Sequence, residues 1–111
     1  MAYDEDLAQR IRALVGAERG LTEKKMFGGL AFLVGGNMAI AASGQGGILV
    51  RVGPERSDQL VKATKASVAV MRGRPMAGWL RVGAADVGTK RQLAKWVDLG
   101  VDFARSLPAK G

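Results

Sequence analysis

The side chains that most enzymes use for proton transfer, nucleophilic attack and metal binding are largely missing from this chain. None of its 111 residues is a histidine or a cysteine. A Ser-His-Asp triad, a Cys-His pair, the usual zinc site and a disulfide framework therefore cannot form. Catalysis would depend on carboxylates, lysine, arginine or hydroxyl groups. We therefore expect no enzymatic activity, no catalytic residue, no metal and no cofactor.

The chemistry that the chain does offer is positive charge, concentrated in its second half. The net charge is +7. Residues 1–53 hold 6 Lys/Arg and 5 Asp/Glu, which leaves +1, whereas residues 54–111 hold 11 Lys/Arg and 5 Asp/Glu, which leaves +6. Such an excess attracts nucleic acid or an acidic protein partner, and it also serves solubility without any partner.

The densest basic group lies between positions 72 and 91. Its members are Arg72, Arg74, Arg81, Lys90 and Arg91. If an expected loop at 72–78 meets the start of the last helix at one edge, these side chains form one anion-binding patch, and helix N-terminal amides add to it. For Arg74, between Gly73 and Pro75, the alternative is hydrogen bonding to carbonyls of its own loop.

Other candidates have more ordinary interpretations. Asp98 and Asp102 share one helical face, but no third metal ligand accompanies them. The glycine-rich stretch 44–47 lacks the Lys-Ser/Thr pair of a phosphate-binding loop. Trp79 and Trp96 have the rings needed to stack on bases, yet each lies in an apolar pattern that favours core packing.

Arg51 is a further charged residue of interest, because it is the one charged side chain at the end of an apolar run. Its neighbours Val50 and Val52 point to the opposite side of an extended chain. Arg51 is therefore either exposed or paired with a buried carboxylate.

These side chains must be positioned by a region of short apolar runs separated by glycine clusters. Glycine adopts positive φ without steric cost, so each cluster is a place where a hairpin can reverse. Gly28-Gly29 within the first run indicates a bulge or a close backbone approach. The expected strands are 26–34, 38–42 and 48–52, with turns at 35–37 and 44–47.

Amphipathic patterns on both sides of this region predict helices that pack on the sheet. Thr89 and Gln92 form a capping box at the start of the last helix. The remaining expected elements are a helix at 3–16, a polar connector at 17–24, a helix at 53–63, strands at 68–71 and 79–82, and a helix from 89 to 107.

The expected order is α-β-β-β-α-β-β-α, which predicts an α+β fold with an antiparallel sheet and helices packed on it. Residues 1–111 are expected to form a single domain. The acidic start of the chain is unlike a signal peptide, and no apolar run reaches the length of a membrane helix. We therefore expect a cytoplasmic protein.

Several short motifs follow one another along the chain: MFGGLAFL at 26–33, GNMA at 36–39, VRVGPE at 50–55 and GRPMAGW at 73–79. Together with Trp96-Val97 and Phe103-Ala104, they resemble the N-terminal domain of the TfoX/Sxy family, and the resemblance covers nearly the whole chain. The motif residues that carry it are Met26, Phe27, Gly28, Gly29, Arg51, Gly73, Arg74, Pro75, Met76 and Trp79.

The resemblance implies a fold akin to the type III secretion chaperones, and it implies no cofactor and no catalytic residue. It also implies a regulatory role, since TfoX/Sxy proteins regulate natural competence together with the cyclic-AMP receptor protein. Full-length regulators carry a second, helical domain, so a chain that ends at Gly111 is expected to be a stand-alone N-terminal domain. A homodimer is expected from the same resemblance.

We therefore expect a non-enzymatic regulatory or adaptor domain that acts through a protein partner, such as a transcription factor. The alternative is an accessory protein that binds nucleic acid directly through residues 72–91. The salt dependence of binding separates the two, because contacts to phosphates weaken steeply as salt rises.

Overall fold

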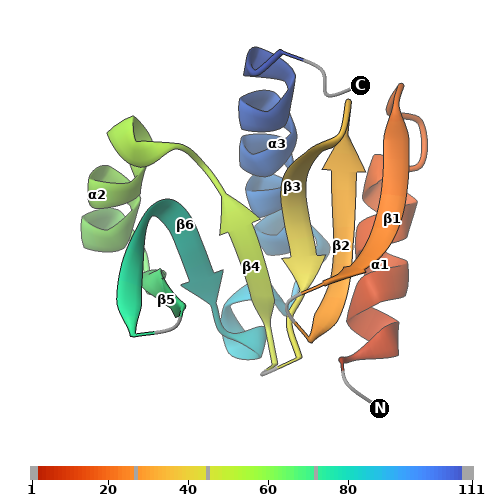
Figure 1. Ribbon diagram of the computed structural model, residues 1–111. Helices are drawn as coiled ribbons and strands as arrows, with labels where there is room; N and C mark the ends of the chain where they lie inside the picture. The colour runs from red at the N-terminus through yellow and green to blue at the C-terminus, as the bar shows by residue number, and fades with distance from the viewer. Residues whose placement is uncertain (1–2, 27, 45, 72, 109–111) are drawn as a thin grey trace.

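A six-stranded antiparallel sheet carries three α-helices in this computed structural model, which describes residues 3–26, 28–44, 46–71 and 73–108. The strand order across the sheet is β1-β2-β3-β4-β6-β5 (Figure 1). In chain order the elements are α1 (Glu5–Val15), β1 (Leu21–Met26), β2 (Gly29–Val34), β3 (Asn37–Ala42), β4 (Ile48–Arg51), α2 (Pro54–Ala63), β5 (Ser67–Met71), β6 (Arg74–Val82), the 3-10 helix η1 (Ala84–Val87) and α3 (Lys90–Ser106).

The helices pack on one face of the sheet and enclose the main core with it. Alternate strand residues such as Phe32, Ile40 and Leu80 point to that face and are fully buried. The buried stripe of α3 packs against them, and Figure 1 shows α3 crossing behind the sheet, with α2 beside β6. This architecture confirms the predicted α+β fold with helices packed on an antiparallel sheet.

The region before the first predicted strand needs a correction. Residues 17–24 were expected to be a connector, but Leu21–Met26 form β1, which pairs in register with β2. The polar composition of β1 gave no strand signal, because an edge strand exposes most of its side chains. It therefore lacks the alternation of apolar and polar residues that marks a half-buried strand. The run predicted as one strand at 26–34 is consequently two strands separated by a turn at Gly28, whose φ is +74°.

Residues 72–78 were expected to form a loop, and for residues 74–78 this was wrong. Arg74 begins the nine-residue strand β6, which forms a hairpin with β5. The pairing with β4 begins only at Trp79, so Pro75 faces a strand on one side alone. Proline is compatible with a strand there, because the missing N–H is not needed on the unpaired side.

Other local predictions are confirmed. The hairpin turns fall between β2 and β3 and between β3 and β4, at the predicted glycine clusters. The capping box is present: the Gln92 amide donates to Thr89 Oγ1 at 3.1 Å, and the Thr89 amide donates to Gln92 Oε1 at 3.0 Å. The close-approach interpretation also holds for Gly29, where a Cβ atom would lie 2.0 Å from the Ala42 carbonyl oxygen.

A bidentate ion pair joins the edge strand β1 to α1. Arg12 donates from Nε to Glu23 Oε2 and from Nη2 to Glu23 Oε1, both at 2.6 Å. These hydrogen bonds hold the pKa of the Glu23 carboxyl below its ordinary value near 4.5. Such a group adds stability that is present above the ordinary pKa and is lost as pH falls through the lowered one.

We therefore expect a small acid-induced loss of stability that depends on Glu23. Between about pH 5 and pH 3, Glu23→Gln should lower the slope of the unfolding free energy against pH. The effect is small because both side chains are about one-third exposed, at 38% and 33%. Urea unfolding across this range tests it, with Asp98→Asn, an exposed site on α3, as the control of equal charge change. An unchanged slope in Glu23→Gln would contradict the expectation.

Candidate functional site

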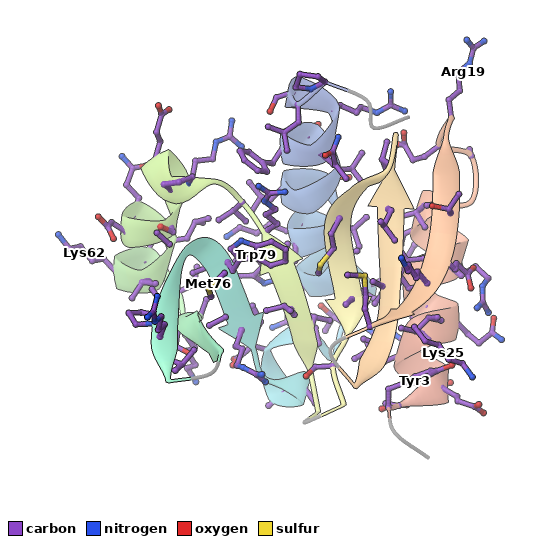
Figure 2. The ribbon with its side chains drawn as sticks, in the orientation of Figure 1. Tyr3, Arg19, Lys25, Lys62, Met76 and Trp79 are labelled. Carbon is purple, nitrogen blue, oxygen red and sulfur yellow. The ribbon has the colours of Figure 1, made fainter. Side chains whose placement is uncertain are left out.

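The sheet face opposite the helices, called here the open face, carries a second apolar cluster. It is built from buried small and medium side chains, and three larger ones are partly buried against them. The buried members are Ala31, Met38, Ala41, Leu49 and Ala69, and the partly buried ones are Met26, Leu33 and Trp79. Figure 2 shows Trp79 on this side, in front of the sheet and away from α3.

Positive charge lies on the open face, and no carboxylate of the described strands points to it. Strands β2 to β6 contain three charged residues, Arg51, Arg74 and Arg81. Register places Arg81 beside Leu49 and Lys24 beside Ala31, so both point to the open face. The single acidic residue of the strands, Glu23, is the helix-side partner of Arg12.

One arginine of this face lies close to two aromatic rings. The Arg51 guanidinium carbon lies 5.0 Å from the centroid of the Trp79 ring and 5.1 Å from that of Phe103. We call these three residues the Arg51 corner. Among the residues that the structure describes, no carboxylate lies within ion-pair distance of Arg51, so the paired alternative for this residue is excluded there.

Backbone contacts between distant segments build this corner. The Gly78 carbonyl accepts hydrogen bonds from the amides of Val52 at 2.8 Å and Gly53 at 3.2 Å. These bonds place the end of β4 beside the bend of β6. Gly53 leaves room for Phe103 of α3, because a Cβ at that position would lie 2.6 Å from the Phe103 ring.

Arg81 is the second arginine at this place. It lies diagonally from Arg51, since Arg51 faces Trp79 and Arg81 faces Leu49 across the β4–β6 ladder. Its Nη1 donates a long hydrogen bond of 3.4 Å to Ser43 Oγ. Like Arg51, Arg81 is half-buried.

The corner brings together two of the sequence motifs, 50–55 and 73–79, with Phe103. The family model for the TfoX N-terminal domain matches residues 13–104. The chain belongs to the TfoX N-terminal domain family. This family is associated with competence regulation and not with catalysis. Neither a curated protein nor a solved structure matches the chain, so the likeness to secretion chaperones stays a prediction.

The basic group predicted at 72–91 is divided between different parts of this TfoX N-terminal domain. Arg81 lies on the open face, whereas Lys90 and Arg91 begin α3, whose Leu93 packs into the core on the other face. Arg74 is exposed at the start of β6, and Arg72 lies outside the described residues. The sheet itself therefore separates side chains that are close in sequence.

The structure also shows where the other predicted motif residues of the β5–β6 hairpin lie. Gly73 turns the β5–β6 hairpin with φ of +76°, and exposed Pro75 and half-buried Met76 follow it in β6. Arg74 makes no side-chain hydrogen bond to its own turn among the described residues. Phe27 lies outside them.

The remaining candidates offer no site in the described part of the chain. Trp96 is 4% exposed, which confirms its predicted core role. Asp98 and Asp102 are exposed on α3, and residues 3–26, 28–44, 46–71 and 73–108 contain no group of three side chains suited to a metal ion. Within the same ranges, every helix is too short or too polar to cross a bilayer.

The Arg51 corner could not be found from the sequence. Arg51 and Trp79 are 28 positions apart, and Phe103 is 24 positions further along. The available signal was a single arginine at the end of an apolar strand, which does not indicate its aromatic neighbours. Only the pairing of β4 with β6 and the packing of α3 bring the three together.

Proposed function

We propose that this chain is a non-enzymatic regulatory adaptor domain, and that its open face docks an acidic segment of a protein partner such as a transcription factor. The observation that supports this most directly is the charge of the open face. Its strands present Arg51, Arg81 and Lys24, with no carboxylate from the described strands on that side. Membership of a family associated with competence regulation agrees with such a role.

The shape of the open face also suits a protein segment. Ala31, Ala41 and Ala69 are themselves buried, so a partner chain meets the larger, partly exposed side chains that pack against them. Half-buried Trp79 offers apolar contact beside Arg51, and half-buried Met26 offers it at the β1 edge of the face. A mixture of apolar contact area with charges of one sign favours a partner segment that is both acidic and apolar.

Direct binding of nucleic acid is the second candidate, favoured by the net charge of +7 and by the half-buried Trp79 on a basic sheet. The distribution of charge argues against it. Arg81 points to the open face, whereas Lys90 begins α3 on the helix side, so the cations are not gathered on one surface. Proteins that bind duplexes strongly neutralise roughly six to ten phosphates, more than the three cations of the open face.

Removing the two arginine charges of the open face should strongly weaken binding of an acidic peptide. The probe is a labelled peptide of glutamate and leucine, and fluorescence anisotropy measures its binding. We expect Arg51→Gln with Arg81→Gln to weaken binding at least tenfold, because each lost charged hydrogen bond is worth about 1.5–3 kcal/mol. Circular dichroism checks that the double variant is folded.

The matched control is Lys90→Gln with Arg91→Gln, which removes the same charge from the start of α3. Peptide binding should be nearly unchanged in this control. Equal weakening in both double variants would show that net charge, and not the open face, drives binding. Tight, steeply salt-dependent binding of a labelled DNA duplex, without peptide binding, would favour the second candidate.

A further inference from the structure

The Arg51 guanidinium is half-buried and lies close to two aromatic rings. Trp79 and Phe103 lie about equally far from it, at 5.0 and 5.1 Å. Contact with two rings restricts a guanidinium, so it loses less freedom on binding, and its planar fork has parallel N–H donors that match a carboxylate. With no carboxylate bound to it among the described residues, Arg51 is ready to accept one from outside.

The direction of approach follows from the surrounding charges. Phe103 also lines a cavity of about 450 Å³ on the helix side, and that cavity carries Glu55 and Asp102 together with Arg56. Its charges are mixed with an acidic excess, so it attracts an anionic group less than the open face does. A carboxylate therefore reaches Arg51 from the open face, where Arg81 and Lys24 add positive charge.

The position of Arg81 relative to Arg51 sets the spacing between two carboxylates that bind to them. Residues diagonally placed on an antiparallel pair, as Arg51 and Arg81 are, lie about 7–8 Å apart. Alternate residues of an extended chain point to the same side and are roughly 6.6 Å apart. Two acidic side chains separated by one residue therefore match the two arginines, whereas adjacent acidic residues point to opposite sides.

We propose that Arg51 and Arg81 bind two acidic side chains at alternate positions of one extended segment of a partner protein. This rests on the proposed function and adds a recognition pattern to it. Arg51, oriented by its two rings, is the more selective of the pair. Arg81, held by one long bond to Ser43, adapts to the second carboxylate.

Two capped peptides of equal composition test this pattern: Leu-Glu-Thr-Glu-Leu and Leu-Glu-Glu-Thr-Leu. NMR follows the indole N–H signals of Trp79, in the corner, and of Trp96, which at 4% exposed is the internal reference. We expect a saturable shift of Trp79 alone. The alternating peptide should bind several-fold more tightly than the adjacent one.

Substitutions assign the two arginines. Arg51→Lys keeps the charge but loses the planar fork, and it should lower affinity for the alternating peptide roughly tenfold. Arg81→Gln should remove the preference between the two peptides. The comparison of peptides on the unmodified chain needs no variant, so it holds even if a variant folds poorly.

Each of the other outcomes contradicts a specific statement: the alternating pattern, the proposed function, or the carboxylate as the bound group. Equal affinity for both peptides would overturn the alternating pattern. The proposed function would stand in that case if the double variant of Arg51 and Arg81 still lost binding. Absence of any peptide binding would overturn both. Inorganic phosphate that shifts Trp79 at lower concentration than the alternating peptide would assign the corner to phosphate groups and also overturn the inference.

Discussion

Replacing Gly78 by alanine should lower the free energy of unfolding by about 3 kcal/mol, because the new Cβ has neither the backbone conformation nor the space it needs. Gly78 has φ of +87°, which costs an L-residue roughly 1 kcal/mol or more. The Cβ would also lie 2.8 Å from the Pro54 nitrogen and 2.9 Å from the Gly53 carbonyl carbon. Backbone atoms cannot rotate away, so overpacking adds about 1–3 kcal/mol.

Gly73→Ala is the matched control for this substitution. Gly73 has a similar φ of +76°, but nothing lies within 4 Å of its Cβ position. It should therefore show the conformational cost alone, about 1 kcal/mol. Chemical denaturation of both variants separates the two costs. Equal losses of stability would mean that the contact between Gly78 and the start of α2 is not tight.

The consequence of Gly78→Ala should extend to the Arg51 corner. The Gly78 carbonyl accepts the amides of Val52 and Gly53, so moving this bend displaces the end of β4 that carries Arg51. We expect the Trp79 indole signal to shift in Gly78→Ala and to remain in place in Gly73→Ala.

Replacing Gly100 by alanine should also destabilise the fold, by about 2 kcal/mol, although alanine is the better helix former. Gly100 lies in the middle of α3, where alanine would normally gain about 1 kcal/mol. Its Cβ would lie 2.4 Å from the Ala39 carbonyl oxygen, so α3 must move off the sheet. Overpacking against backbone, at the upper end of about 1–3 kcal/mol or beyond it, outweighs the gain in propensity.

The control for Gly100 is Gly88→Ala. Gly88 has an ordinary φ of −70°, and its Cβ position is 3.8 Å from the nearest atom. This substitution should leave stability unchanged or raise it by less than about 1 kcal/mol. Thermal unfolding followed by circular dichroism measures both variants. A stabilised Gly100→Ala would show that α3 can shift away from β3 at little cost.

Elements with a strong local signal were predictable. The glycine clusters around 35–37 and 44–47 reverse the chain, since positive φ is a property of single residues. The capping box at Thr89 and the apolar stripe of α3 were equally predictable from the sequence, because both depend on residues within a few positions of one another. The fold class followed from the order of these elements.

Elements defined by their partners were not predictable. β1 is polar and became a strand only through its ladder with β2. The start of β6 has a composition typical of loops, yet pairing with β5 extends it to Arg74. Local composition gave the wrong answer in both places, because the hydrogen bonds that decide them come from residues far along the chain.

The sequence by itself determined a small α+β domain without histidine or cysteine, rich in positive charge and carrying the motifs of its family. Composition and local periodicity are sufficient for such conclusions. The tertiary structure alone decided which cations lie near one another. It placed Arg81 on the open face and Lys90 at the start of α3, and it brought Arg51 beside both Trp79 and Phe103. Strand register and helix packing make these neighbourhoods, and neither is encoded in the spacing of the residues along the chain.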